Sequence, residues 1–102
     1  AEQVLKKAIE KSESSQDIFN NNLGLHYYNL QLYDKAIEFY QKAIALRSNY
    51  ALYYDNLGLA FENLSRSHEA EAAYKKAAEL EPGNVLYLNR LGVFYFRQEQ
   101  FT

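Results

Sequence analysis

The dipeptide Leu-Gly occurs three times in this chain at one fixed spacing, and each copy is followed three residues after its glycine by an aromatic residue. The copies begin at Leu23, Leu57 and Leu91, so they are 34 residues apart. A second pattern, Ala-x-x-x-Tyr-x-x-Ala, begins at Ala36 and again at Ala70, with the same spacing. Two independent markers with one period of this length indicate a chain built of stacked structural repeats.

These motifs, followed by Pro82, resemble the tetratricopeptide repeat, a helix-turn-helix unit. The resemblance covers nearly the whole chain and implies an all-α fold, a right-handed α-solenoid of stacked antiparallel helix pairs. It also implies complete repeats over residues 17–50 and 51–84. Residues 85–102 would form the first helix of a truncated repeat, and residues 1–16 a helix like the second helix of a preceding repeat, followed by a Ser-rich loop.

Apolar residues recur at helical spacing within the first complete repeat. In residues 17–30 they lie at steps of four, four and three, which places them on one face of a helix. The same device predicts a second helix over residues 34–46, and the short turn at residues 31–33 requires the two helices to pack antiparallel. The apolar residues of the first helix are Phe19, Leu23, Tyr27 and Leu30.

Polar residues mark the expected helix boundaries. Asp34 and Ser67 are expected to cap the second helices of the two repeats, because their side-chain oxygens can accept a first-turn N–H. Ser12, Ser14 and Ser15 are expected to form a loop after an N-terminal helix over residues 2–11.

Three glycines lie inside expected helices, where each costs about 1 kcal/mol relative to alanine. They are Gly24, Gly58 and Gly92. Their recurrence indicates a steric requirement, since a missing side chain lets a partner helix approach closely. Tyr40 and Tyr74 are expected to fill the space between neighbouring hairpins.

In the family that this chain resembles, the first helices of successive repeats line a concave surface that binds extended peptides or partner helices. Carried onto this sequence, the surface would combine aliphatic and aromatic stripes with rows of amides. The expected groove residues are Ile18, Asn22, Leu25, Tyr28, Leu52, Asn56, Leu59, Leu86, Asn89, Arg90, Val93 and Phe96.

The row formed by Asn22, Asn56 and Arg90 has two interpretations. Carboxamides carry both donors and acceptors, so such a row can bind the backbone of an extended peptide regardless of its sequence. The same amides could instead bond neighbouring repeats to one another. Both interpretations stay open on the sequence alone.

A second family device is the clamp that holds the acidic carboxy-terminal tails of heat-shock chaperones. Asn56 and Arg90 occupy two of its positions, but Asn21, Leu25 and Leu86 stand where the clamp has Lys, Asn and Lys. Two cations are thereby lost, and a carboxylate is bound best by charged donors. The sequence therefore favours a ligand with an apolar stretch over an acidic one.

Composition and motifs argue against several other functions. The net charge is −2 and no run of five like charges occurs, so we expect no nucleic-acid partner. No apolar run approaches the roughly 20 residues that span a bilayer, so no membrane partner is expected. His26 and His68 lack further ligands at metal-binding spacing, and neither a nucleophile–base pair nor a Gly-rich phosphate loop is present. We expect no enzyme activity, cofactor or metal, and a cytoplasmic location.

The sequence thus predicts a non-catalytic scaffold whose groove binds a peptide or helix of another protein. One alternative is self-association, by stacking or helix exchange through open repeat ends that carry Tyr95, Phe101 and the apolar side of residues 4–9. Another alternative is a substrate-recruiting domain of a larger enzyme.

Overall fold

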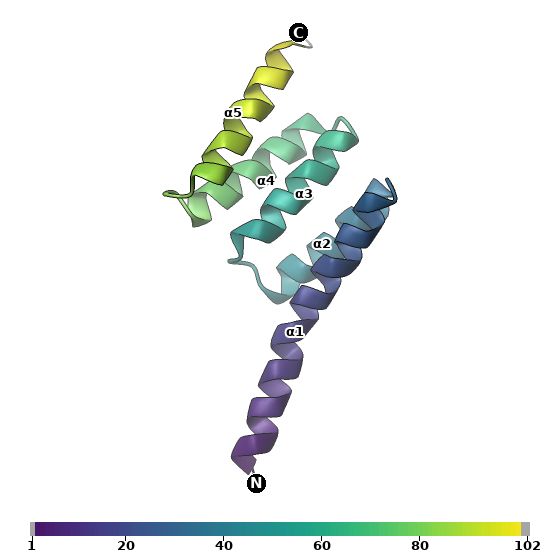
Figure 1. Cartoon of the computed structure of the whole chain (residues 1–102), viewed down its shortest axis with the longest axis vertical. Helices are drawn as coiled ribbons and strands as arrows, with labels where there is room; N and C mark the ends of the chain where they lie inside the picture. The colour runs from purple at the N-terminus through teal and green to yellow at the C-terminus, as the bar shows by residue number, and fades with distance from the viewer. Residues whose placement is uncertain (1, 101–102) are drawn as a thin grey trace.

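The chain forms a stack of antiparallel helices. The computed structural model describes residues 2–100, with side chains from residue 16 onward, and within that range it contains five α-helices and no strand. The helices are α1 (Glu2–Asn29), α2 (Tyr33–Leu46), α3 (Ala51–Asn63), α4 (Ser67–Leu80) and α5 (Val85–Gln100). α1 pairs with α2 and α3 with α4, and α5 lies on the second pair (Figure 1). The predicted all-α stack is confirmed.

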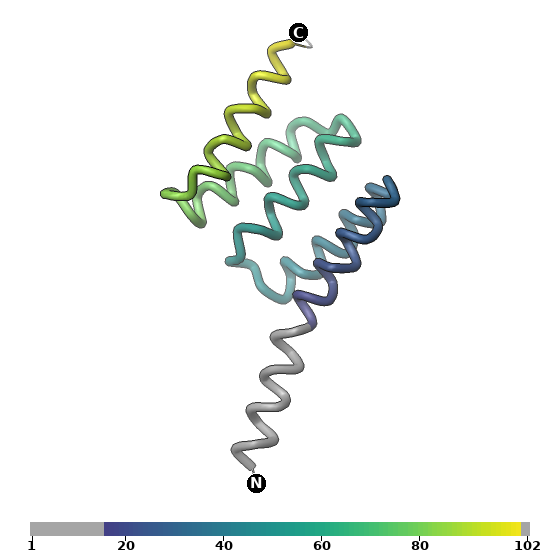
Figure 2. Tube along the Cα trace, in the orientation of Figure 1, coloured from purple at the N-terminus to yellow at the C-terminus, as the bar shows by residue number. Residues whose placement is uncertain are grey.

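The Cα trace shows three successive layers: the α1–α2 pair, the α3–α4 pair and the single helix α5 (Figure 2). α1, α3 and α5 are the first helices of their layers, and α2 and α4 are the second helices. Because each layer repeats the one before it, residues 34 positions apart occupy equivalent places.

α1 begins earlier than the sequence predicts. It runs without a break from Glu2 to Asn29, so the loop expected at Ser12, Ser14 and Ser15 is not present. Serine inside a helix costs less than about 0.7 kcal/mol relative to alanine, and no glycine or proline precedes residue 24. The apolar contacts expected of residues 4–9 and of Phe101 lie outside the described side chains, and the assignment of residues 1–16 to a preceding repeat stays a prediction.

The turns inside the two helix pairs share one geometry. After α1, Gln31 takes the left-handed conformation with φ 63°. The amide of Leu32 donates to the Tyr27 carbonyl and the amide of Gln31 to the Tyr28 carbonyl, both at 2.9 Å, which is the Schellman pattern. The same pair of bonds follows α3, where Ser65 has φ 60°.

This turn geometry explains why the predicted helix caps were wrong. The residues at the cap positions of α2 and α4 are Leu32 and Arg66, and neither makes a side-chain cap bond. The Schellman turn leads directly into the next helix, so Asp34 already lies inside the first turn of α2, and Ser67 is the first residue of α4. The Asp34 carboxylate there still interacts favourably with the helix dipole.

Two of the three helical glycines mark close crossings, as predicted. A Cβ atom added at Gly24 would lie 2.5 Å from the ring of Tyr40, and one added at Gly58 would lie 2.5 Å from the ring of Tyr74. Gly92 differs, because a Cβ atom there would meet nothing within 4 Å among the described residues. The steric explanation therefore holds for the first two layers and is wrong for Gly92, whose helix has no described second helix packed against it.

The core runs through all three layers. Tyr74 of α4 meets Phe94 of α5 with ring centroids 5.6 Å apart and an edge-on angle of 64°, which joins α5 to the second pair. A smaller cluster of Ala51, Ala77 and Tyr87 lies beside it. The main core consists of Ala36, Ile37, Tyr40, Leu57, Ala60, Phe61, Ala70, Ala73, Tyr74 and Phe94.

We expect Gly58→Ala to lower the free energy of unfolding by about 1–3 kcal/mol, because the new Cβ would overlap a buried Tyr74 ring. Gly92→Ala is the matched control in the same Leu-Gly context. Its Cβ meets open space, so the better helix propensity of alanine should raise the free energy of unfolding by up to about 1 kcal/mol. Urea denaturation followed by circular dichroism measures both changes, and two variants of equal stability would contradict the close crossing.

Candidate functional site

Polar contacts link the first helices of neighbouring layers, and four of these contacts join residues 35 positions apart. Between α1 and α3, the Asn56 Nδ2 atom donates to Asn21 Oδ1 at 2.9 Å. The Asn63 Nδ2 atom donates to the Tyr28 hydroxyl oxygen at 3.0 Å. Asn21 is equivalent to Asp55 in the next layer but bonds Asn56, one residue further along. Tyr28 is equivalent to Glu62 and likewise bonds the following residue, Asn63.

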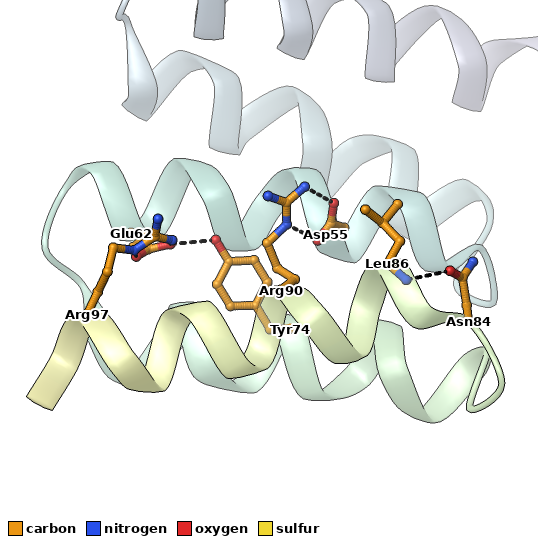
Figure 3. Close-up of polar contacts among 7 residues, drawn as sticks. All are labelled: Asp55, Glu62, Tyr74, Asn84, Leu86, Arg90 and Arg97. Atoms are coloured by element: carbon orange, nitrogen blue, oxygen red, sulfur yellow. Dashed lines mark hydrogen bonds and ion pairs between the residues drawn. The ribbon is translucent and has the colours of Figure 1, made fainter.

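Between α3 and α5 the links are ion pairs (Figure 3). The Arg90 guanidinium donates to both carboxylate oxygens of Asp55, at 2.9 and 3.1 Å. The Arg97 guanidinium donates to both carboxylate oxygens of Glu62, at 2.6 and 2.7 Å. Bidentate geometry of this kind is the strongest arrangement of an arginine and a carboxylate.

Burial distinguishes the Asp55–Arg90 pair from a surface salt bridge. The Asp55 side chain is only 3% exposed, and its bonds to Arg90 raise the pKa of that guanidinium above its ordinary value. Glu62 also accepts a hydrogen bond of 2.8 Å from the Tyr74 hydroxyl. Burial, and then this bond, raise the Tyr74 pKa well above the ordinary value for tyrosine. Both carboxylates of α3 are therefore fully engaged with neighbouring elements.

A further buried contact joins α1 to α3 at the other end of the face. The Tyr53 hydroxyl donates to the Asp17 carboxylate at 2.5 Å, and both residues are 2% exposed. Burial, followed by this bond, raises the Tyr53 pKa. The buried carboxylate is stabilised by this donor, so Asp17 belongs to the interface between layers.

Between the polar links, exposed apolar side chains form two rows across the first helices. Seven residues, or two helical turns, separate the rows, so they lie on one side of each helix and about 10 Å apart along its axis. The first row comprises Ile18, Leu52 and Leu86, and the second row comprises Leu25, Leu59 and Val93. We call these the apolar rows; five of the six side chains are 37–52% exposed, and Leu59 is half-buried.

A cavity of about 460 Å³ opens beside the second apolar row. It lies between all three first helices and the turn after α3. Its lining residues are Tyr28, Leu59, Glu62, Asn63, Ser65 and Arg97. The cavity therefore combines an aliphatic and an aromatic wall with a neutralised ion pair.

Most of the predicted groove residues lie accessible on this face. Ile18, Asn22, Leu25, Leu52, Leu86, Asn89, Val93 and Phe96 are exposed, and Tyr28, Leu59 and Arg90 are half-buried. The predicted row of one polar residue per repeat is not uniform. Asn22 is exposed, whereas Asn56 is only 8% exposed and bonded to Asn21, and Arg90 is bonded to Asp55.

At Asn56 the structure thus supports the interpretation in which amides bond neighbouring repeats. The sequence reasoning missed the two ion pairs between α3 and α5. A signal was present, because opposite charges occur 35 residues apart twice, at Asp55 with Arg90 and at Glu62 with Arg97. These pairs can be recognised only if contacts are expected at 35 residues, one more than the repeat period of 34.

Two further features, metal-ligand clusters and membrane-spanning helices, are absent from the described residues. In the part of the chain covered by the structure, no three His, Asp or Glu side chains gather as metal ligands would. Within residues 2–100, none of the helices combines the length and apolar character that crossing a bilayer requires.

Comparisons with known proteins agree with the helical stack. The family model described as tetratricopeptide repeat (TPR) matches residues 14–80. The Arabidopsis OM64 TPR domain is 27% identical, with a TM-score of 0.79, and the match covers 87% of this chain and 74% of that one. MamA is also 27% identical, with a TM-score of 0.77, over 84% of this chain and 50% of that one.

A third similar structure is the first TPR domain of Spaghetti (RPAP3), described as bound to the HSP90 peptide SRMEEVD. It is 26% identical with a TM-score of 0.75, and the match covers 82% of this chain and 68% of that one. No curated protein matches the chain at a significant level.

We expect Asn56→Ala to lower the free energy of unfolding by about 1–3 kcal/mol, since it removes a buried bond and leaves Asn21 Oδ1 without its donor. Asn22→Ala is the matched control, because Asn22 is the residue equivalent to Asn56 in the first layer. Its side chain is exposed, so its effect should stay below about 0.5 kcal/mol. Chemical denaturation compares the two variants, and equal effects would mean that the Asn21–Asn56 bond does not join the layers.

Proposed function

Because this chain belongs to the tetratricopeptide repeat family, we propose that it is a non-catalytic interaction module whose α1–α3–α5 face binds a polypeptide with an apolar stretch. The observation that carries this proposal is the pair of exposed apolar rows. Apolar side chains gathered on one face of a small protein mark an interaction surface more often than scattered ones do. Six positions in two rows supply several anchor points for one ligand.

The electrostatics of the face favour an apolar ligand over an acidic one. Arg90 is held by Asp55 and Arg97 by Glu62, each through two hydrogen bonds. An acidic peptide, such as the HSP90 peptide described with the Spaghetti domain, would have to compete with these carboxylates for the guanidinium groups. An apolar peptide needs no such exchange, so it can bind to the face as it stands.

Exposed amides beside the apolar rows supply polar contacts for the ligand backbone. Asn22 lies between Ile18 and Leu25 on α1, and Asn89 is exposed on α5 three residues after Leu86. A carboxamide can both donate to and accept from a peptide backbone. The apolar rows would therefore select side chains, and the amides would fix the course of the main chain.

The spacing of the apolar rows fits a peptide or a helix. The two apolar rows lie about 10 Å apart along each first helix, because seven residues separate them. Residues seven apart on a helical ligand are separated by about 10.5 Å. Residues three apart on an extended ligand span a similar length. Both kinds of ligand can place one apolar side chain in each row.

Selection from a phage-displayed random peptide library against the intact chain tests this proposal. The selected peptides should share apolar residues at such spacings and should not be enriched in Asp or Glu. Their affinities are then measured by fluorescence polarisation on the wild-type chain and on two variants. A selection dominated by acidic sequences would overturn the preference that we infer from the paired arginines.

The two variants differ only in the face that they alter. Leu25→Lys places a charge in the second apolar row and should weaken binding at least about tenfold, the effect of losing about 1.4 kcal/mol. Leu46→Lys is the matched control, because Leu46 is 52% exposed on α2, outside the rows. Equal losses for both variants, or no loss for Leu25→Lys, would contradict binding at the apolar rows.

Self-association is the second candidate, and the outer face of α5 favours it. Val85, Leu88 and Tyr95 are 64%, 50% and 41% exposed there, and the space over Gly92 is open. The equivalent faces of α1 and α3 are covered by α2 and α4. Light scattering on dilution of the free chain separates the candidates, since a monomer at every concentration would exclude an interface between copies.

A further inference from the structure

A second cavity lies on the side of α3 that is turned away from the apolar rows. Its volume is about 290 Å³, and its walls are almost entirely apolar. Residues 54, 57 and 61 share one face of α3, about 180° around the helix from residues 52 and 59 of the apolar rows. The cavity is lined by Tyr54, Leu57 and Phe61 of α3 and by Glu69, Ala72, Ala73 and Lys76 of α4.

The first helix pair holds an aromatic ring at the equivalent place. Phe39 of α2 is stacked on Tyr27 of α1, with ring centroids 5.4 Å apart and planes within 11° of parallel. The Lys42 ammonium lies 4.7 Å from the centroid of the Phe39 ring, within cation–π distance. In this layer the ring of Phe39 thus lies between the Tyr27 ring and the Lys42 ammonium.

The second helix pair has an aromatic residue and a lysine at the matching positions but no ring at the position of Phe39. Phe61 stands 34 residues after Tyr27, and Lys76 stands 34 residues after Lys42. The position equivalent to Phe39 is Ala73. Since the backbone of the layer is repeated, the loss of one phenyl group leaves the hollow that the cavity occupies.

An exposed ion pair lies beside this cavity. Arg66 lies over the Phe61 ring, 4.8 Å from its centroid, and binds Glu69 through two hydrogen bonds of 2.7 and 2.6 Å. The Phe61 ring is only 5% exposed, so a ligand in the cavity meets little of its surface. A volume at the lower end of the range of small-molecule pockets, about 300–1,000 Å³, suits one ring better than a larger ligand.

We propose that this cavity is a second binding site, which accepts one aromatic side chain from a partner polypeptide. The incoming ring takes the place that Phe39 holds in the first layer. It packs against Tyr54, contacts the methyl groups of Ala72 and Ala73, and lies under the Lys76 ammonium. The site is separate from the apolar rows, so its occupation does not require a ligand there.

A single-residue probe tests this proposal directly. N-acetyl-phenylalanine amide is titrated into the isotope-labelled chain, and the methyl signals of Leu57, Ala72 and Ala73 are followed by nuclear magnetic resonance. We expect saturable shifts confined to these residues and their neighbours. N-acetyl-cyclohexylalanine amide, which has a similar shape and no π-system, should bind about two- to fivefold more weakly. The absence of saturable shifts at the cavity would overturn the proposal.

The decisive variant is Ala73→Phe, which installs the residue of the first layer. We expect the chain to fold, because Phe39 is accommodated at the equivalent place, and we expect the shifts at Leu57 and Ala72 to be lost. Leu25→Lys, in the apolar rows, should leave the titration unchanged. Shifts that persist in folded Ala73→Phe would show that the probe binds elsewhere.

A second variant keeps the test informative if Ala73→Phe does not fold. Lys76→Gln retains the length of much of the side chain and removes the cation from an exposed position. It should weaken binding of the phenylalanine probe about two- to fivefold and leave the cyclohexylalanine probe unaffected. Equal effects on both probes would contradict a ring held under the Lys76 ammonium.

Discussion

Polar links between the first helices determine which surface this molecule presents. Asn21 with Asn56, Asp55 with Arg90 and Glu62 with Arg97 join one layer to the next, and each link removes hydrogen-bonding capacity from the exposed face. The side chains that stay exposed between them are the aliphatic residues of the apolar rows, Phe96 and the amides of Asn22 and Asn89. Because Arg90 and Arg97 are bonded to carboxylates of α3, we propose that the apolar rows are the part of this face that binds a ligand.

A repeated backbone allows neighbouring layers to differ by single side chains. The Gly58 and Tyr74 crossing repeats that of Gly24 and Tyr40, so the two helix pairs have nearly the same frame. Within that frame the change from phenylalanine at position 39 to alanine at position 73 opens a cavity. The two binding surfaces that we propose therefore lie on opposite sides of α3 within one fold.

The sequence predicted helices α2 to α5, the pairing of the helices and two glycine crossings, because the 34-residue period and the apolar spacing repeat in every layer. It placed a loop at Ser12, Ser14 and Ser15 where α1 is continuous. The caps predicted at Asp34 and Ser67 are not formed, because the left-handed turns at Gln31 and Ser65 lead directly into the next helix. The burial of Asn56 depends on how two layers are offset, which no single segment encodes. The repeat period is 34 residues, but contacts between layers join residues 35 apart. Asn56 therefore bonds the buried Asn21, and Asn22, its equivalent in the first layer, stays exposed.

The most direct measurement is a double-mutant cycle on the free energy of unfolding with Asp55→Asn, Arg90→Gln and the double variant. If the bidentate pair joins α3 to α5 and thereby withholds the guanidinium from ligands, the two substitutions should be coupled by about 1–3 kcal/mol. A coupling energy indistinguishable from zero would mean that Arg90 is available to acidic ligands, and it would contradict an apolar binding face built on paired charges.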